Sequence, residues 1–203
     1  MNIRRIPKFI GSLKNLTYLD LAGNNINSVP DFIGSLKELT YLNLAGNNIS
    51  VVSNFIGSLK ELTYLNLAGN NISVVPKFIG SLKELTYLDL GGNKINVVPK
   101  FIGSLKELTY LGLAGNPITG IIPPQLGNLT KLQSLDFSST SRMSNYEWIS
   151  HLTSLKTLTL SKVNFTVAEL QSFKGAPFLS SLSISNCLLP KEPSLLAFKI
   201  SQQ

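Results

Sequence analysis

Five tyrosines recur at a fixed spacing of 23 residues, each next to a threonine, and the first four are close to an acid or an amide. Tyrosine offers a large, rigid and amphipathic contact area, which suits binding rather than bond cleavage. Apolar and polar residues alternate around each tyrosine, which predicts short strands whose tyrosines form a stripe on the open face. The candidate ligand-binding residues are Tyr18, Tyr41, Tyr64, Tyr87 and Tyr110, with the adjoining column Asp20, Asn43, Asn66 and Asp89.

These columns also have a purely structural interpretation. Cross-strand aromatic pairs and threonine neighbours stabilise a sheet by ~0.2–1 kcal/mol per pair. Near-identical repeats copy every column whether or not it binds anything, so both interpretations stay open. Beyond the fifth tyrosine the open-face positions vary, and there we add Asp136, Lys156 and Lys162 to the candidate ligand-binding residues.

A second aromatic column follows the same spacing outside the predicted strands. Its members are Phe9, Phe32, Phe55, Phe78 and Phe101, followed by Gln125 and Trp148. We expect partial burial between successive turns of the chain. The alternative is an apolar stripe on the outer face that recruits a partner.

Residues suited to catalysis or metal binding are scarce. His151 is the only histidine, and Cys187 is the only cysteine, so no intrachain disulfide is possible. No paired carboxylates, metal-ligand spacing or phosphate-binding loop occurs. We therefore expect no enzyme activity, no cofactor and no metal site.

Charge and hydropathy restrict the partners. The formal net charge of +7 is dispersed without a run of like charges, which argues against a nucleic-acid interface. No apolar run approaches the ~20 residues that cross a bilayer. The first residues lack the apolar region of a signal peptide, so the chain as written would be cytoplasmic. It would be extracellular or on the cell surface if it is part of a receptor-like protein.

The elements that position these side chains follow from the leucines of the repeat. Within residues 36–58, the inward positions Leu36, Leu39, Leu42, Leu44 and Ile49 belong to a strand, a turn and a return segment. The return segments contain Pro and Gly, which predicts extended or 3₁₀ structure. Eight parallel strands are expected around Leu19, Leu42, Leu65, Leu88, Leu111, Leu135, Leu158 and Leu182.

An asparagine follows each of the first five strands and should turn into the core. A buried amide is costly unless it is hydrogen-bonded, so we expect these side chains to bond the loop backbone of neighbouring repeats as a ladder. The ladder residues are Asn24, Asn47, Asn70, Asn93 and Asn116. Thr140, Val163 and Cys187 take the same position later, which explains Cys187 as a core residue.

The pattern L-x-x-L-x-L-x-x-N-x-I identifies a leucine-rich repeat. Gly120, Ile122, Pro123, Leu126, Gly127 and Leu129 also match the plant-type pattern, and the chain resembles the ectodomains of plant receptor-like proteins and receptor-like kinases. The resemblance implies an α/β solenoid, a right-handed superhelix with eight parallel strands on the concave face and extended or 3₁₀ turns on the convex face. It also implies a non-catalytic module that binds a protein or peptide ligand through the concave sheet.

The repeats are of two kinds within one predicted domain, 1–203. Residues 1–118 hold near-identical 23-residue repeats, and residues 119–203 hold diverged plant-type repeats of 23–24 residues. The near-identity supports a second hypothesis. In it the chain is a consensus-like, engineered or truncated scaffold with no evolved ligand, which self-associates through uncapped ends.

Overall fold

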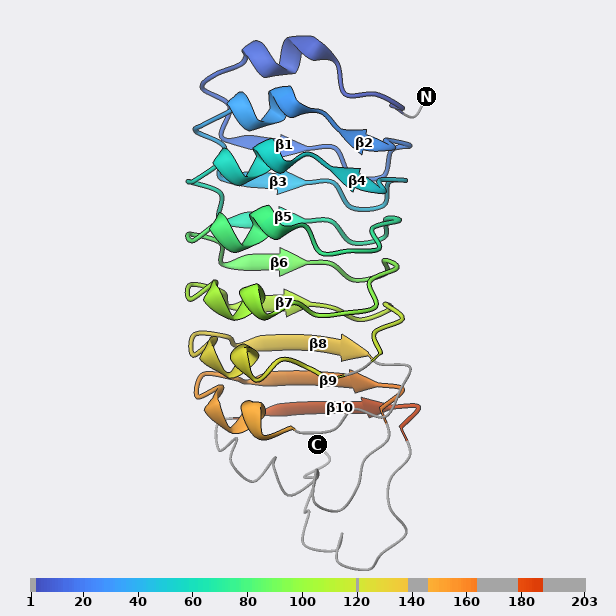
Figure 1. Cartoon of the computed structure of the whole chain (residues 1–203), viewed down its shortest axis with the longest axis vertical. Coiled ribbons are helices and arrows are strands. Elements are labelled where there is room, and N and C mark those ends of the chain that lie inside the picture. The colour runs from blue at the N-terminus through green and yellow to red at the C-terminus, as the bar shows by residue number, and fades with distance from the viewer. Residues whose placement is uncertain (1–2, 120, 139–145, 164–178, 188–203) are drawn as a thin grey trace, which may run out of the picture.

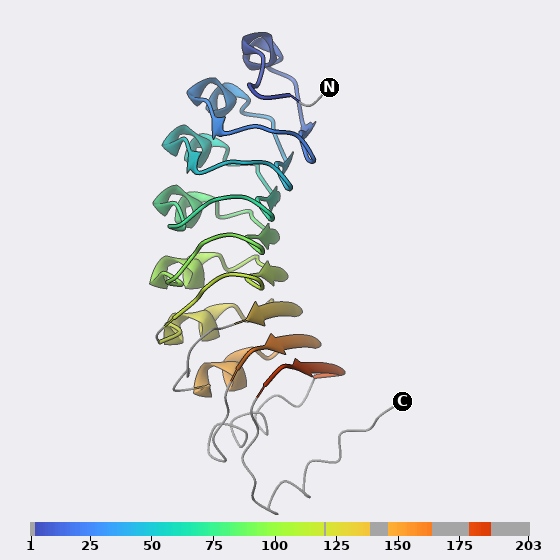
Figure 2. The ribbon, with the colours of Figure 1, turned by 90° about the vertical axis from the view of Figure 1, so that its right-hand side faces the viewer.

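The chain winds into a curved solenoid with strands along one long face and short helices along the other (Figures 1 and 2). The computed structural model describes residues 3–119, 121–138, 146–163 and 179–187. The strands lie on the inner side of the curve and the helices on the outer side, as Figure 2 shows. The predicted leucine-rich solenoid is therefore confirmed.

The inner face is one parallel sheet of eight strands in the order β1-β3-β5-β6-β7-β8-β9-β10. Its strands are β1 (Tyr18–Asp20), β3 (Tyr41–Asn43), β5 (Tyr64–Asn66), β6 (Tyr87–Asp89), β7 (Tyr110–Gly112), β8 (Ser134–Ser138), β9 (Thr157–Ser161) and β10 (Ser181–Ser185). Every predicted strand leucine pairs with the next one, from Leu19 with Leu42 to Leu158 with Leu182. This register places equivalent residues of successive repeats side by side.

The outer face carries one 3₁₀ helix per repeat, and the described residues contain no α-helix. The helices are η1 (Lys8–Ser12), η2 (Asp31–Ser35), η3 (Asn54–Ser58), η4 (Lys77–Ser81), η5 (Lys100–Ser104), η6 (Pro124–Asn128) and η7 (Glu147–His151). Most begin after a proline in extended conformation, such as Pro30. Each ends one residue before a leucine such as Leu36, whose N–H bonds the carbonyl of Ile33. One tight turn of five residues is thus enough to return the chain to the next strand.

A second, smaller sheet on the outer side was not predicted. β2 (Ser28–Val29) and β4 (Val51–Val52) pair in parallel, with Ser28 opposite Val51 and Val29 opposite Val52. The sequence analysis expected extended structure here without pairing. Two β-branched valines favour an extended backbone, and stacking of the coils then brings equivalent segments within hydrogen-bonding distance.

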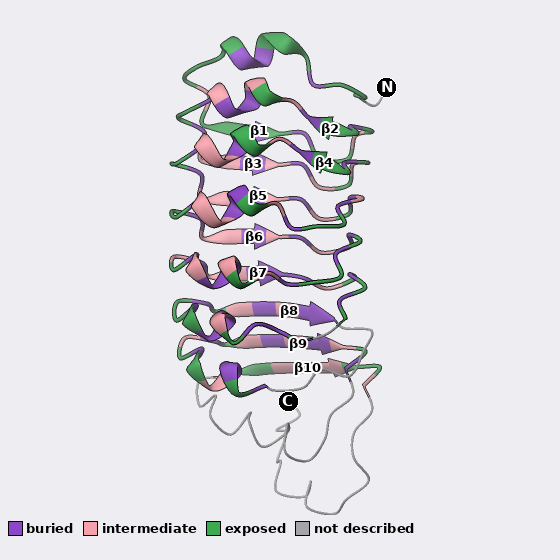
Figure 3. Ribbon diagram, viewed as in Figure 1, coloured by how far each residue is buried: buried purple, intermediate pink, exposed green. Residues whose placement is uncertain are grey.

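Leucine, isoleucine and valine side chains fill the space between the two faces. Figure 3 shows buried residues on both the strands and the helices. Leu42 is 1% exposed and Ile49 is fully buried, as expected for the inward positions of the repeat. Burying a side chain of this size contributes about 1.5–3 kcal/mol. Each coil therefore depends on its neighbours to cover its apolar residues.

The predicted asparagine ladder runs along the edge of this core. The Oδ1 atom of Asn93 accepts the N–H of Ile72 at 3.0 Å, and its Nδ2 atom donates to the carbonyls of Leu67 and Leu90 at 2.9 and 3.0 Å. The same pattern joins Asn47, Asn70 and Asn116 to the coils before them. Each bond set ties two successive coils together.

Cys187 occupies the ladder position of the last described coil. Its Sγ atom accepts the N–H of Val163 at 3.3 Å and lies 3.8 Å from the carbonyl of Leu160. Val163 itself is fully buried. The prediction that Cys187 serves the core is therefore confirmed, while Thr140 lies outside the described residues.

Candidate functional site

The five predicted tyrosines form one continuous stack on the inner face. Successive ring centroids from Tyr18 to Tyr110 lie 4.1, 4.2, 4.2 and 4.4 Å apart, and the ring planes differ by only 7–12°. Neighbouring strands are about 4.8 Å apart in a sheet. The rings are closer than the strands because the sheet curves toward the side that carries them.

The tyrosine stack becomes less exposed along the sheet. Tyr18 is 56% exposed at one end, and the following four tyrosines are half-buried. Burial raises the pKa of Tyr64, Tyr87 and Tyr110, and the Asp89 carboxylate raises the last two further. The hydroxyls stay protonated at neutral pH, so the stack offers apolar ring surface and neutral hydrogen-bonding groups.

The acid and amide column beside the stack has a structural role that the sequence analysis missed. The Oδ1 atom of Asn43 accepts the N–H of Ala45 at 3.1 Å, and the Oδ1 atom of Asp89 accepts the N–H of Gly91 at 2.9 Å. Asp20 and Asn66 make the same bond. An acid or amide two residues before a turn is a known turn signal, so the sequence did contain this information. This bond uses the single side-chain oxygen of the two asparagines. Only the two aspartates have a second oxygen, and that of Asp20 accepts from Nδ2 of Asn43 at 3.1 Å.

Gly112 interrupts this column between Asp89 and Asp136. It pairs with Asp89 on one side and with Asp136 on the other. A Cβ atom at Gly112 would lie 2.4 Å from Oδ1 of Asp89 and 3.0 Å from the hydroxyl of Tyr110. The Asp89 carboxylate and the Tyr110 hydroxyl therefore border the space that a side chain at residue 112 would fill. The sequence analysis did not single out Gly112, although a glycine that breaks a repeated column was a visible signal.

The carboxylate on one side of Gly112 affects the carboxyl group on the other side. Burial raises the pKa of Asp136, and the charge of Asp89 raises it further. Asp136 is half-buried on β8, next to the last tyrosine of the stack. A ligand with positive charge would relieve this repulsion, whereas a negatively charged ligand would increase it.

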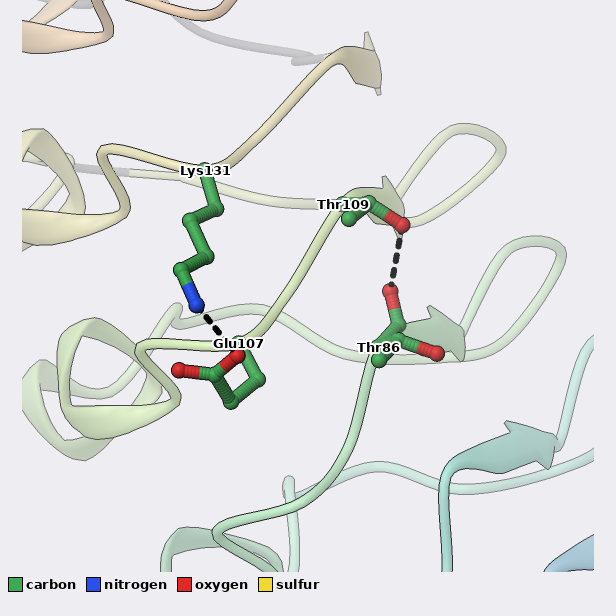
Figure 4. Close-up of polar contacts among 4 residues, drawn as sticks. All are labelled: Thr86, Glu107, Thr109 and Lys131. Atoms are coloured by element: carbon green, nitrogen blue, oxygen red, sulfur yellow. Dashed lines mark hydrogen bonds and ion pairs between the residues drawn. The ribbon is translucent and has the colours of Figure 1, made fainter.

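The threonine column on the other side of the stack supports the sheet. The Oγ1 atom of Thr109 donates to the carbonyl of Thr86 at 3.0 Å, as Figure 4 shows, and Thr40, Thr63 and Thr86 make the same bond. Figure 4 also shows the ion pair between Lys131 and Glu107, which joins the near-identical repeats to the diverged ones. Both of its side chains are substantially exposed, so this pair contributes little stability.

The two lysines among the candidate residues lie at opposite ends of β9. Lys156 precedes β9 and lines a cavity of about 420 Å³ together with Gln133, Thr153, Ser154 and Ser180. Lys162 lies beyond β9 in the turn, with φ of 57°. Gly46 and its equivalents hold this left-handed position in the first five repeats. The expectation that Lys162 lies on the sheet face was therefore wrong, because the chain has already left the strand at this residue.

The second aromatic column does not form a continuous stripe. Phe9 and Phe55 are 65% and 60% exposed, whereas Phe78 and Trp148 are 9% and 3% exposed. Three of its seven members are partly buried between the turns, as expected. Because exposed and buried members are mixed along the column, it does not form a single apolar surface by itself.

Other kinds of site have no support within the described ranges. His151 is exposed at the end of η7, and the described residues contain no group of three or more metal-ligating side chains. None of the helices in these ranges has the length and apolar character needed to span a membrane.

Comparisons with known proteins agree with this geometry. A family model described as a leucine-rich repeat region matches residues 49–188, and a second leucine-rich repeat model matches residues 2–49. Receptor-like protein EIX1 of Solanum lycopersicum is 40% identical over 75 residues, which are 36% of this chain and 7% of that protein.

Two solved plant receptors have a similar structure. The plant peptide hormone receptor RGFR1 in complex with RGF2 matches 94% of this chain with a TM-score of 0.81 and 33% identity. The Arabidopsis receptor kinase HAESA, in complex with the peptide hormone IDA and the co-receptor SERK1, matches 90% with a TM-score of 0.72 and 28% identity. The chain spans only 32% and 31% of these two structures.

Proposed function

Since this chain belongs to the leucine-rich repeat proteins and is of plant type, we propose that it is a non-catalytic recognition module that binds a protein or peptide on its concave sheet. Leucine-rich repeat domains are in general ligand-binding modules without catalytic activity. The observation that carries the proposal is the tyrosine stack from Tyr18 to Tyr110, which presents ring surface along five strands. Two receptors with a similar fold are bound to peptide hormones.

The shape of the concave face supports an extended ligand. The stack ends at Tyr110, and the same column continues as Ser134, Thr157 and Ser181. Large side chains thus give way to small hydroxyl side chains at the start of the diverged repeats. A ligand that lies across β6 to β9 would contact ring surface, the Gly112 gap and the hydroxyl-bearing strands in succession.

The proposal is tested with peptides selected from a display library against the whole protein. We expect the variant Tyr64→Ala/Tyr87→Ala to bind the selected peptides about 100-fold more weakly, since a central aromatic side chain contributes about 1–2 kcal/mol or more to an interface. Tyr64→Phe/Tyr87→Phe keeps the stack and should lose less. Isothermal titration calorimetry gives the affinities, and circular dichroism verifies the fold of each variant.

The matched control changes exposed residues of the same two coils, Glu61→Ala/Glu84→Ala, and should leave binding unchanged. If every selected peptide binds the tyrosine variant as tightly as the unmodified protein, the concave face is not the binding surface.

The alternative of a scaffold without an evolved ligand makes a different prediction. If the chain is such a scaffold, no selected peptide will depend on the tyrosine stack for binding. The protein will also self-associate more as its concentration rises. Phe9 and Leu13 of the first described coil are 65% and 45% exposed, which favours such contact. Light scattering over a wide concentration range measures it, and a monomer at high concentration would contradict self-association.

A further inference from the structure

A row of exposed aliphatic side chains runs along the outer side of the solenoid. Val51, Val74, Val97 and Ile121 are 64%, 72%, 57% and 70% exposed. Each is followed by a buried residue, such as Val52 at 9% and Val75 at 3%. The alternation of outward and inward side chains keeps these residues on the surface at the same place in four successive coils. We call these four residues the outer ridge.

The outer ridge is not explained by repetition alone. The equivalent residue of the first repeat is Ser28, which pairs with Val51 in the small outer sheet. Ile121 lies in the diverged part of the chain and still carries a β-branched aliphatic side chain. Four neighbouring coils about 4.8 Å apart give the ridge a length of about 15 Å.

Basic residues border the outer ridge. Lys94 lies three residues before Val97, while Lys77 and Lys100 begin η4 and η5, three residues after Val74 and Val97. No acidic residue lies within three positions of any ridge residue in the sequence. The ridge thus has positive charge on both sides of Val97 and on one side of Val74. Asp31, which begins η2 and accepts a hydrogen bond from Ser53 at 2.6 Å, places an acid near its other end.

The row of ridge positions ends at a hollow that also carries basic residues. A cavity of about 500 Å³ is lined by Arg5, Ile6, Lys8, Asn27, Ser28, Pro30 and Phe32. Ser28 joins this hollow to the ridge through its pairing with Val51. The hollow accommodates a side chain, and its two cations favour an acidic or polar one.

We propose that the outer ridge binds an acidic amphipathic helix of a partner protein. A helix of about ten residues is about 15 Å long, and its 5.4 Å pitch brings one apolar side chain per turn close to each ridge residue. Glutamates on the two flanks of that helix reach the lysines on either side. A second copy of this chain fits poorly, because its own ridge would bring the same positive charges together.

The probe is a synthetic 14-residue helical peptide with one leucine stripe flanked by glutamates, measured against the whole protein by fluorescence anisotropy. Val74→Thr/Val97→Thr keeps β-branched side chains of the same size, and we expect about tenfold weaker binding because each substitution replaces one apolar methyl group by a hydroxyl. Lys77→Gln/Lys100→Gln should weaken binding to a similar extent and flatten its salt dependence. The concave-face variant Tyr64→Phe/Tyr87→Phe is the control and should bind the probe unchanged.

Several results would overturn the proposal. A probe with lysines in place of the glutamates that binds equally well removes the charge argument. Equal binding to the threonine variant, or no binding at all, removes the ridge from consideration as a helix site. Binding to vesicles of anionic phospholipid but not to the peptide would assign the surface to a membrane, and dimers that the threonine variant abolishes would assign it to a second copy. None of these results depends on the concave face.

Discussion

The ladder predicts that the cost of losing an asparagine depends on its place in the solenoid. Asn93 is 6% exposed. Its amide accepts a hydrogen bond from the N–H of Ile72 and donates to the carbonyls of Leu67 and Leu90. Asn93→Ala leaves the buried N–H of Ile72 without this partner, whereas the two carbonyls still accept from the amides of Asn70 and Asn116. An unsatisfied buried donor costs about 1–3 kcal/mol, so together with the two lost bonds to carbonyls we expect a loss of about 2–3 kcal/mol in the free energy of unfolding.

Asn24 offers a control with the same residue, the same substitution and the same place in the repeat. Its Nδ2 atom bonds only carbonyls of its own coil, those of Leu21 and Ala22, while its Oδ1 atom accepts the exposed N–H of Ile3. Water replaces these bonds after Asn24→Ala. We therefore expect a loss of only about 1 kcal/mol, the usual net value of a hydrogen bond or two.

Urea unfolding followed by circular dichroism measures both variants against the unmodified protein. Equal slopes of free energy against urea concentration would show that the same cooperative unit unfolds in each case. The explanation of the ladder as a chain of inter-coil bonds is refuted if Asn24→Ala costs as much as Asn93→Ala. It is also refuted if both substitutions cost less than about 1 kcal/mol.

Three further substitutions probe close packing and charge. Gly103→Ala places a Cβ atom 2.1 Å from the backbone oxygen of Gln125, and we expect a loss of more than about 2 kcal/mol in chemical unfolding. Gly112→Ala meets the movable Asp89 side chain instead, so we expect less than about 1 kcal/mol together with weaker binding of concave-face peptides. The raised pKa of Asp136 means that the folded protein holds this proton more tightly than the unfolded chain. The free energy of unfolding of the protein therefore falls as the pH rises above about 4. Asp136→Asn should remove this pH dependence, which thermal unfolding between pH 3 and 7 measures.

The fold was predictable because the features that define it repeat. Each strand leucine pairs with its equivalent, and each ladder asparagine makes bonds that its sequence position requires. The core of a solenoid uses only contacts between neighbouring coils, so a local pattern contains nearly all the information about it. The same logic placed Cys187 correctly, because it follows a strand at the ladder spacing.

The surface was predictable only in part, because exposure depends on the neighbours of a residue as well as on its own segment. Phe55 and Phe78 both precede the sequence Ile-Gly-Ser, yet one is 60% exposed and the other 9%. The leucine pattern alone also suggested that Lys162 belongs to a strand. Comparison with the column of left-handed glycines, such as Gly46, would have placed it in the turn.

Repetition has a consequence for the candidate site itself. A residue that recurs in every repeat can serve sheet stability as well as binding, so the loss of a tyrosine affects both. A break in a column is not required by the repeat and therefore carries independent information. Gly112 is such a break, since it opens a gap between two carboxylates while the tyrosine beside it is kept. A substitution that fills this gap with little loss of stability separates a binding role for the concave face from a structural one more sharply than removing any tyrosine.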